Sequence, residues 1–261
     1  MPVINYSPDL LQPIPRSEGR SRLGIRGAIP FSGVDIWNGY ELSWLNEQGK
    51  PVAVSCEFRF PATSPNIIES KSLKLYLNSF SETRHSSVEA IHSILHNDLG
   101  DTSGADTTIQ ISSVTSSRPL IESELLGNCI DDISLETSTY DLDPSLLSGS
   151  TDTKIHVTET LYSHLLKTNC PVTGQPDWAS LIVRYKGAQI EQKQLLAYLV
   201  SYRNHAEYHE QCIERIFIDI QNHCQPEALT VYACYTRRGG LDINPFRSNF
   251  EEVPEKFQSL R

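Results

Sequence analysis

One cysteine stands out as a residue that could do covalent chemistry. Cys170 lies in the stretch Thr168-Asn-Cys-Pro-Val-Thr-Gly-Gln-Pro-Asp177-Trp, whose two prolines and one glycine predict a rigid loop. Asp177 follows seven residues later, so one reversal of the chain can bring its carboxyl group to the thiol. A thiolate is a nucleophile, and a carboxyl group can move a proton on or off the group attacked. The alternative is an ordinary loop thiol.

Four of the other five cysteines are expected to be packing residues. The N-terminus has no apolar segment typical of a signal peptide, so free thiols are expected rather than disulfides. The absence of a CxxC pair argues against a zinc ribbon. Cys212 and Cys224 fall in a predicted helix, and Cys56 and Cys234 fall in predicted strands, where a thiol packs as a small apolar group.

A histidine–glutamate pair, His209-Glu210, lies at the start of a predicted helix. An acidic residue there commonly complements the helix dipole, which is the alternative to a functional role. His205 lies one turn earlier and could form a metal pair with His209. No third ligand is evident, however, and His205-Ala-Glu-Tyr-His209 does not match the HExxH motif. We therefore expect no metal site.

The common phosphate-binding motifs do not occur. Neither GxGxxG nor GxxxxGK[ST] is found, so a nucleotide cofactor would have to bind outside a Rossmann domain. The strongest candidate is the run that begins Thr236-Arg-Arg-Gly-Gly-Leu, because arginines beside glycines let guanidinium and backbone groups approach a phosphate together. The same run is also compatible with a plain surface turn.

These candidates depend on a framework of predicted strands and helices. Apolar and polar residues alternate over 52–60, which predicts a half-buried strand. Residues 1–30 predict an irregular arm with its arginines, Arg16 to Arg26, in solvent, and residues 101–153 predict long loops or a linker. The predicted strands are 52–60, 107–114, 181–185 and 229–236, and the predicted helices are 72–80, 87–99, 191–202 and 208–224.

Part of the chain is repeated. Residues 68–80 align with residues 190–202 at an offset of 122, with seven of thirteen positions identical, where composition alone would give about one. The repeat predicts an α+β fold of two tandem modules, each an antiparallel sheet with helices packed on one face. We expect an irregular arm at 1–30, an N-terminal module at 31–150 and a C-terminal module at 151–261 that carries the candidate nucleophile.

The two copies differ where chemistry is expected. Cys170 and Asp177 align with Leu45 and Val52, and the pair at 209–210 aligns with a small and an apolar residue. Only the second copy therefore carries the thiol, the carboxyl group and the imidazole. A site assembled from both copies would explain this asymmetry.

The composition limits the classes of function. The 261 residues are 39% hydrophobic and 21% charged, which is typical of a globular protein and not of a membrane, collagen-like or disordered chain. No stretch of about 18 apolar residues occurs, so we expect a cytoplasmic protein with no membrane association. The net charge of −10 argues against nucleic-acid binding. These features favour an enzyme that acts on a small molecule.

Four motifs together resemble one family. They are Glu69-Ser70-Lys71-Ser-Leu-Lys-Leu-Tyr76, Cys170 with Asp177, His209-Glu210, and Tyr235-Thr-Arg-Arg-Gly-Gly-Leu-Asp-Ile-Asn-Pro. Over about residues 30–250 the chain resembles the NADPH-dependent nitrile reductases of queuosine biosynthesis, the 7-cyano-7-deazaguanine reductases, in their long two-module form. The resemblance implies a tunnelling fold in each module, shared with GTP cyclohydrolase I, an active site between the modules, and a homodimer.

The resemblance also implies roles for residues. Cys170 would attack the nitrile carbon to form a thioimide, Asp177 would supply a proton, and His209 would orient the substrate or move protons. Two hydrides from two NADPH would then give the primary amine, 7-aminomethyl-7-deazaguanine. The remaining implied contacts are substrate binding by Ile68, Glu69, Ser70, His209 and Glu210, and NADPH binding by Ser70, Lys71, Arg238 and Gly239.

Three other functions are compatible with the residues. A cyclohydrolase-like hydrolase of the same fold would need a zinc site. A non-catalytic purine- or pterin-binding module would keep Glu69 and Glu210 but would tolerate loss of Cys170. A cysteine amidase would use Cys170 and His209 and would not consume NADPH.

Overall fold

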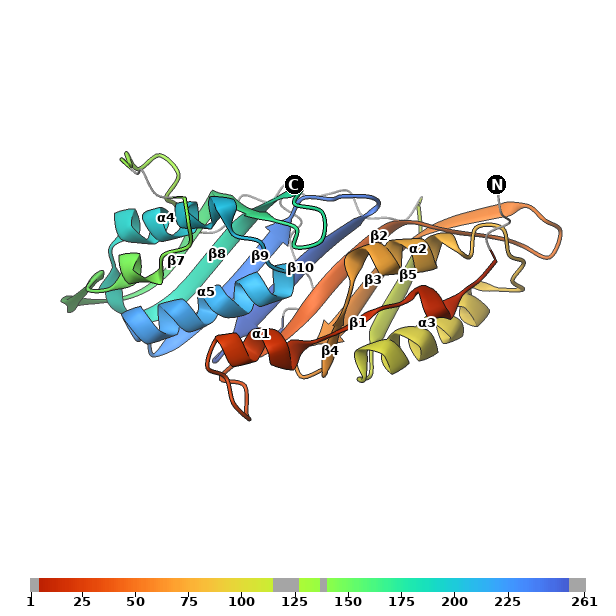
Figure 1. Ribbon diagram of the computed structural model, residues 1–261, viewed down its shortest axis with the longest axis horizontal. Coiled ribbons are helices and arrows are strands. Elements are labelled where there is room, and N and C mark those ends of the chain that lie inside the picture. The colour runs from red at the N-terminus through yellow and green to blue at the C-terminus, as the bar shows by residue number, and fades with distance from the viewer. Residues whose placement is uncertain (1–4, 115–126, 137–139, 254–261) are drawn as a thin grey trace. The chain divides into compact units, whose positions relative to one another are not determined.

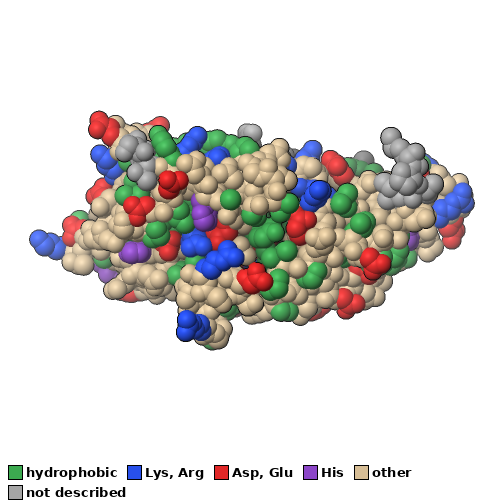
Figure 2. Space-filling model, in the orientation of Figure 1, with side chains coloured by type: hydrophobic (Ala, Val, Ile, Leu, Met, Phe, Trp, Pro, Cys, Tyr) green, Lys and Arg blue, Asp and Glu red, His purple; other side chains and the backbone are tan. Residues whose placement is uncertain are grey.

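The computed structural model describes residues 5–114, 127–136 and 140–253 (Figure 1). The chain divides into two compact units. Unit 1 comprises Met1–Arg22, Val34–Leu120 and Arg237–Ile243, and unit 2 comprises Leu23–Gly33, Ile121–Thr236 and Asn244–Arg261. Among the described residues, no helix is long and apolar enough to span a membrane. The face drawn in Figure 2 carries acidic, basic and apolar side chains together.

The sheet of unit 1 is antiparallel. Its strands are β2 (Ser32–Leu45, in unit 1 from Val34), β3 (Pro51–Pro61) and β5 (Thr108–Ser113), with β3 between the other two. Along β3 every second side chain is buried, from Val54 to Phe60, as the alternation predicts. The turn from β2 to β3 is closed by the Asn46 side chain, which accepts hydrogen bonds from the backbone N–H groups of Gln48 and Lys50.

Two helices cover one face of this sheet, α2 (Ser70–Asn78) and α3 (Val88–Ser103) (Figure 1). Each begins at a capping side chain, Glu69 for α2 and Ser87 for α3, which accepts hydrogen bonds from free N–H groups of the first turn. The helix α3 ends at Gly104, whose φ of +73° terminates the helix in the left-handed conformation. The buried faces of both helices join the core of β2 and β3.

The first thirty residues are more ordered than expected. They contain a 3-10 turn (Pro8–Leu10), the short strand β1 (Pro13–Pro15) and the helix α1 (Arg16–Arg22). The strand β1 pairs with β4 (Asn66–Ile68). Arg16 is buried and forms an ion pair with Asp35, so the expectation that it lies in solvent is wrong. A buried guanidinium is tolerated here because a carboxylate compensates its charge.

Unit 2 repeats the same order of elements. A long hairpin of β7 (Thr151–Asn169) and β8 (Pro176–Ile190) is followed by α4 (Gln192–Val200), α5 (His209–Cys224) and β9 (Ala228–Tyr235). The strand β9 pairs antiparallel with β8 and with the second half of β10 (Leu241–Ser248). The short β6 (Asn128–Cys129) runs parallel to β7, so this sheet is not antiparallel throughout. Short 3-10 turns lie at Pro144–Leu147 and Ser201–Asn204.

The helices α4 and α5 lie over one face of the unit 2 strands (Figure 1). The apolar face predicted for α5 is buried and includes Cys212, Ile216 and Phe217. All six cysteines are free, as expected. The prediction of a mixed α+β fold is therefore confirmed. The 19-residue β7 was not predicted, and its first three residues, 151–153, were wrongly expected to belong to a loop or linker.

Candidate active site

Cys170 occupies the loop at the end of the β7–β8 hairpin. Its backbone N–H donates to the carbonyl of Gln175 at 2.8 Å, and its carbonyl accepts from the N–H of Gly174 at 2.9 Å. Gly174 has a φ of +68°, a conformation that suits glycine. The chain reversal expected from the sequence is thus a closed hairpin loop, and the Cys170 side chain is only 7% exposed.

Asp177 and His209 contact each other beside this loop. Asp177 is the second residue of β8, where it lies opposite Thr168 of β7. The carboxylate Oδ2 lies 3.2 Å from Nε2 of His209, the first residue of α5, and both side chains are largely buried. Hairpin and helix therefore bring together the thiol loop, the carboxylate and the imidazole, all from unit 2. Such a pair can hold and transfer a proton next to a reacting group.

The imidazole of His209 is also stacked on Tyr235, a residue of the family motif for which no role was expected. The ring of Tyr235, the last residue of β9, lies parallel to His209, with centroids 3.7 Å apart and 6° between the planes. Burial raises the pKa of the Tyr235 phenol well above its usual value, so the phenol stays neutral. The stack covers one face of the imidazole and limits how the ring can turn. The position of Tyr235 just before the Arg-Arg-Gly-Gly motif was the sequence feature that could have drawn attention to this residue.

Three of the buried cysteines other than Cys170 have the properties of packing residues. Burial raises the pKa of Cys56 to about 12, and burial also raises the pKa of Cys212 and of Cys224. A thiol that stays protonated is a poor nucleophile. These three side chains match the packing role that the sequence predicts for them.

In unit 1 the side chain of Glu69 caps the N-terminus of α2. Its two carboxylate oxygens accept hydrogen bonds from the N–H groups of Lys71 and Ser72, at 2.9 and 2.7 Å. Each oxygen keeps a further acceptor position, because a carboxylate offers about four in all. Ile68 packs in the core of unit 1, whereas Ser70 is half-buried and Lys71 is exposed.

The four predicted cofactor residues, at the start of α2 and in the glycine turn, all lie in unit 1. Arg238 and Leu241 bond to each other through their backbones across a two-residue turn, in which Gly239 and Gly240 have φ values of +59° and +78°. A Cβ atom on Gly239 would lie 3.2 Å from the side chain of Lys74, one turn beyond the start of α2. The turn therefore approaches the helix that begins with Ser70 and Lys71.

Side chains on β2 support this turn. Asp242 accepts hydrogen bonds from Asn38 and Tyr40, both at 2.6 Å. Tyr40 in turn lies beneath the guanidinium of Arg237, whose Cζ is 4.8 Å from the ring centroid. The exposed Lys71 at the start of α2 and the glycine turn, which approaches Lys74 of the same helix, provide groups that suit a phosphate-bearing cofactor. These supporting residues were not identified from the sequence, because the contacts join distant segments.

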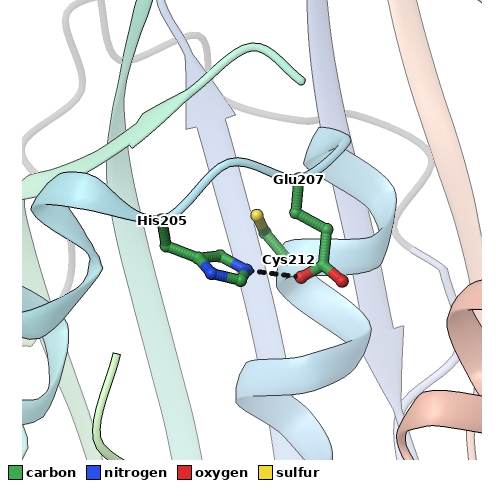
Figure 3. Close-up of side chains that lie close together, drawn as sticks. All are labelled: His205, Glu207 and Cys212. Atoms are coloured by element: carbon green, nitrogen blue, oxygen red, sulfur yellow. Dashed lines mark hydrogen bonds and ion pairs between the residues drawn. The ribbon is translucent and has the colours of Figure 1, made fainter. Parts of the chain in front are cut away.

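The two histidines considered as a possible metal pair, His205 and His209, face different carboxylates. His209 contacts Asp177, whereas His205 Nε2 lies 2.9 Å from Oε2 of Glu207 (Figure 3). His205, Glu207 and Cys212 together place their ligand atoms within 4.8 Å of one another. Both oxygens of Glu207, however, accept hydrogen bonds from the guanidinium of Arg215, so a positive charge already lies against this carboxylate. The donor set is poorly suited to a cation.

Comparison with known proteins decides the family. The family model described as "Nitrile reductase, 7-cyano-7-deazaguanine-reductase N-term" matches residues 3–111, and the model described as "QueF-like protein" matches residues 176–254. The chain belongs to the 7-cyano-7-deazaguanine reductase family. The resemblance inferred from the motifs is thereby confirmed.

Full-length relatives in this family are similar along almost the whole chain. A protein of Bordetella pertussis is 54% identical over 249 residues, which cover 95% of this chain and 90% of the relative. A protein of Burkholderia orbicola is 50% identical over 258 residues, which cover 98% of this chain and 94% of the relative. Both are named NADPH-dependent 7-cyano-7-deazaguanine reductase.

Proposed function

We propose that this protein reduces the nitrile of 7-cyano-7-deazaguanine to the primary amine with NADPH, in tRNA queuosine biosynthesis. The enzyme is an oxidoreductase of the family to which the chain belongs. The single structural observation that carries the proposal is the contact of Asp177 with His209 beside the loop of Cys170. This arrangement supplies a nucleophile and a proton donor in one largely buried place.

The first chemical step forms a covalent bond to the protein. The Cys170 sulfur attacks the nitrile carbon, and one π electron pair of the triple bond moves to the nitrogen. Asp177 gives a proton to that nitrogen, so the product is a thioimide with a carbon–nitrogen double bond. His209 holds Asp177 through the 3.2 Å contact and can restore its proton. Two molecules of NADPH, when bound in turn, would each supply one hydride. The Cys170 sulfur leaves as a thiolate after the first hydride, and the second hydride together with a second proton gives the amine.

We propose that two carboxylates recognise the base. A guanine-like edge offers a ring N–H and an amino group, and a carboxylate can accept both in parallel. Glu210 is 3% exposed and lies next to His209 at the start of α5. Glu69 is the second carboxylate, with acceptor positions left after it caps α2. Ile68, Ser70 and His209 complete the proposed substrate contacts.

The cofactor contacts are proposed for the α2 start and the glycine turn. Lys71 and Arg238 carry the positive charge that the 2′-phosphate of NADPH needs, and Ser70 and Gly239 let the chain approach closely. The proximity of the turn to Lys74 supports this assignment.

The proposed thioimide must also be enclosed by the protein, because water would hydrolyse it.

We further propose that residues 31–150 and 151–261 are two tandem tunnelling-fold modules, preceded by the segment 1–30. Helices α2 and α4 have nine residues each, and α3 and α5 have sixteen each, which supports duplication. A cytoplasmic homodimer completes the proposal, and the six free thiols suit a reducing compartment. No nucleic-acid binding is proposed, because the substrate is a free base and the net charge is −10.

Cofactor stoichiometry tests this function. Purified protein with 7-cyano-7-deazaguanine and excess NADPH should oxidise two NADPH for each nitrile that disappears, with the amine detected by mass spectrometry. Turnover of the substrate without NADPH oxidation would contradict the proposal and would favour a hydrolase. A stoichiometric zinc content in the same preparation would further support the cyclohydrolase-like alternative.

A further inference from the structure

A backbone bridge joins the nucleophile loop to the segment before α5. The N–H of Asn169, the residue before Cys170, donates to the carbonyl of His205 at 2.8 Å. The carbonyl of Asn169 accepts from the N–H of Glu207 at 3.3 Å, which makes a parallel bridge with Ala206. Glu207 lies two residues before His209. The position of the thiol relative to the imidazole therefore depends on the segment 205–207.

A buried carboxylate holds that segment in place. The Glu207 side chain is 4% exposed, and its oxygens accept hydrogen bonds from Nε and Nη2 of Arg215 at 2.9 and 2.8 Å. His205 contacts the same carboxylate at 2.9 Å (Figure 3). Burial raises the pKa of Glu207, but the hydrogen bonds from Arg215 and His205 outweigh it and lower the pKa to about 2. The carboxylate is therefore charged at any pH at which the enzyme would be assayed.

We propose that Glu207 is a positioning residue for the reaction. Its carboxylate anchors the segment 205–207 to the second turn of α5 through Arg215, and the backbone bridge transmits that anchoring to Cys170. The inference rests on the proposed function, because it concerns the rate at which Cys170 attacks the nitrile. A displacement of about 1 Å between reacting groups can cost about 100-fold in rate. Glu207 touches no reacting atom in this scheme, so substrate affinity should change little.

Unit 2 contains a matched control for this pair. Glu214 lies on the same helix, is also buried, and accepts hydrogen bonds from Nε and Nη2 of Arg247 at 3.2 and 2.9 Å. Glu214→Gln removes the same charge from a buried arginine pair. It leaves the 205–207 segment and its bridge to Asn169 untouched, so it reports the cost of losing such a pair in general.

The experiment compares Glu207→Gln and Glu214→Gln in the full chain. The readouts are the rate of adduct formation on Cys170 at saturating 7-cyano-7-deazaguanine without NADPH, the Kd for that base, and the urea midpoint of unfolding. We expect Glu207→Gln to slow adduct formation about tenfold or more with Kd within about threefold. Glu214→Gln should keep the rate within about threefold of the unsubstituted protein, although both variants lower the urea midpoint.

Several outcomes would overturn the inference. If both variants slow adduct formation equally, the effect of Glu207→Gln is only the general cost of losing a buried ion pair. If Glu207→Gln leaves the rate unchanged, Glu207 does not position Cys170. If Glu207→Gln does not fold, Arg215→Lys keeps the charge but loses the paired hydrogen bonds, and it should slow adduct formation by at least about threefold. An unsubstituted protein that forms no adduct would instead contradict the proposed function.

Discussion

The two units differ in which of their equivalent helices carries polar side chains with partners at its N-terminus. In unit 1 the start of α2 carries a polar capping side chain, Glu69, whose two carboxylate oxygens both accept hydrogen bonds from the helix. Its counterpart Glu191 precedes α4, but its side chain accepts no capping hydrogen bond from that helix. In unit 2 the candidate functional groups lie instead at the start of α5, where His209 faces Asp177. The two units therefore carry their candidate functional groups at the starts of helices that are not equivalent.

The comparison indicates that the groups packed against the N-terminus of a helix decide which interactions that terminus can make. At α5 the facing strand supplies Asp177, whereas the aligned residue in the first copy is Val52, which cannot pair with an imidazole. At α2 the neighbouring glycine turn lies against Lys74. Each unit can therefore be tested separately, with the equivalent residue of the other copy as the control.

The largest expected effect comes from Asp177, whose carboxyl group is replaced by the apolar Val52 at the equivalent position of unit 1. Asp177→Asn keeps the shape but cannot give a proton to the nitrile nitrogen. We expect kcat to fall about 10²–10⁴-fold, with the urea midpoint little changed. A kcat within a factor of about three of the unsubstituted enzyme would show that another group supplies the proton.

The stacked tyrosine should have the next largest effect. Tyr235→Leu removes the ring that covers one face of His209, and we expect kcat to fall about tenfold because the imidazole is less well oriented. Tyr235→Phe keeps the ring and should keep most of the activity. Similar losses in both variants, measured in steady-state assays, would assign the effect to the hydroxyl group instead.

A lysine pair compares the two copies directly. Lys71 and Lys193 are equivalent at the offset of 122, and both are exposed one residue inside their helices. We expect Lys71→Ala to raise the KM for NADPH about tenfold, a loss of about 1.4 kcal/mol, and Lys193→Ala to leave it unchanged. Equal effects of the two substitutions on KM would contradict the assignment of the cofactor site to the α2 start.

The smallest effect concerns stability. Glu69→Ala removes a side chain that caps α2 and should lower the free energy of unfolding by about 1 kcal/mol. Glu191→Ala removes no cap and should change it by less than about 0.5 kcal/mol. Urea unfolding of both variants measures the difference. A larger loss for Glu191→Ala would break the comparison between the two helix starts.

Local patterns predicted much of the fold. The alternation over β3 and the apolar face of α5 were sufficient to predict these two elements, because each pattern depends only on residues that are close in the sequence. The full β7 was missed because most of its first half, Thr151 to Glu159, is polar and exposed, and only Ile155 and Val157 alternate with polar residues there. Arg16 was placed in solvent because its partner, Asp35, lies nineteen residues away.

The site was predictable in its residue types but not in its contacts. Cys170, Asp177 and His209 were identified from the loop composition, the repeat and the family resemblance. The contact of Asp177 with His209 and the stack of Tyr235 depend on the packing of α5 against β8 and β9, which no local pattern encodes. The clamp of Glu207 by Arg215 was not found either, since only its His205 neighbour had been considered as a ligand.

The covalent step is the central claim, and intact-mass spectrometry tests it most directly. The protein is mixed with 7-cyano-7-deazaguanine without NADPH, and Cys170→Ala and Cys129→Ala are treated alike, since Cys129 is an exposed thiol outside the site. The account predicts a mass increase equal to one molecule of the base in the unsubstituted protein and in Cys129→Ala, and none in Cys170→Ala. The absence of an adduct under conditions where the base is bound, or its persistence in Cys170→Ala, would contradict it.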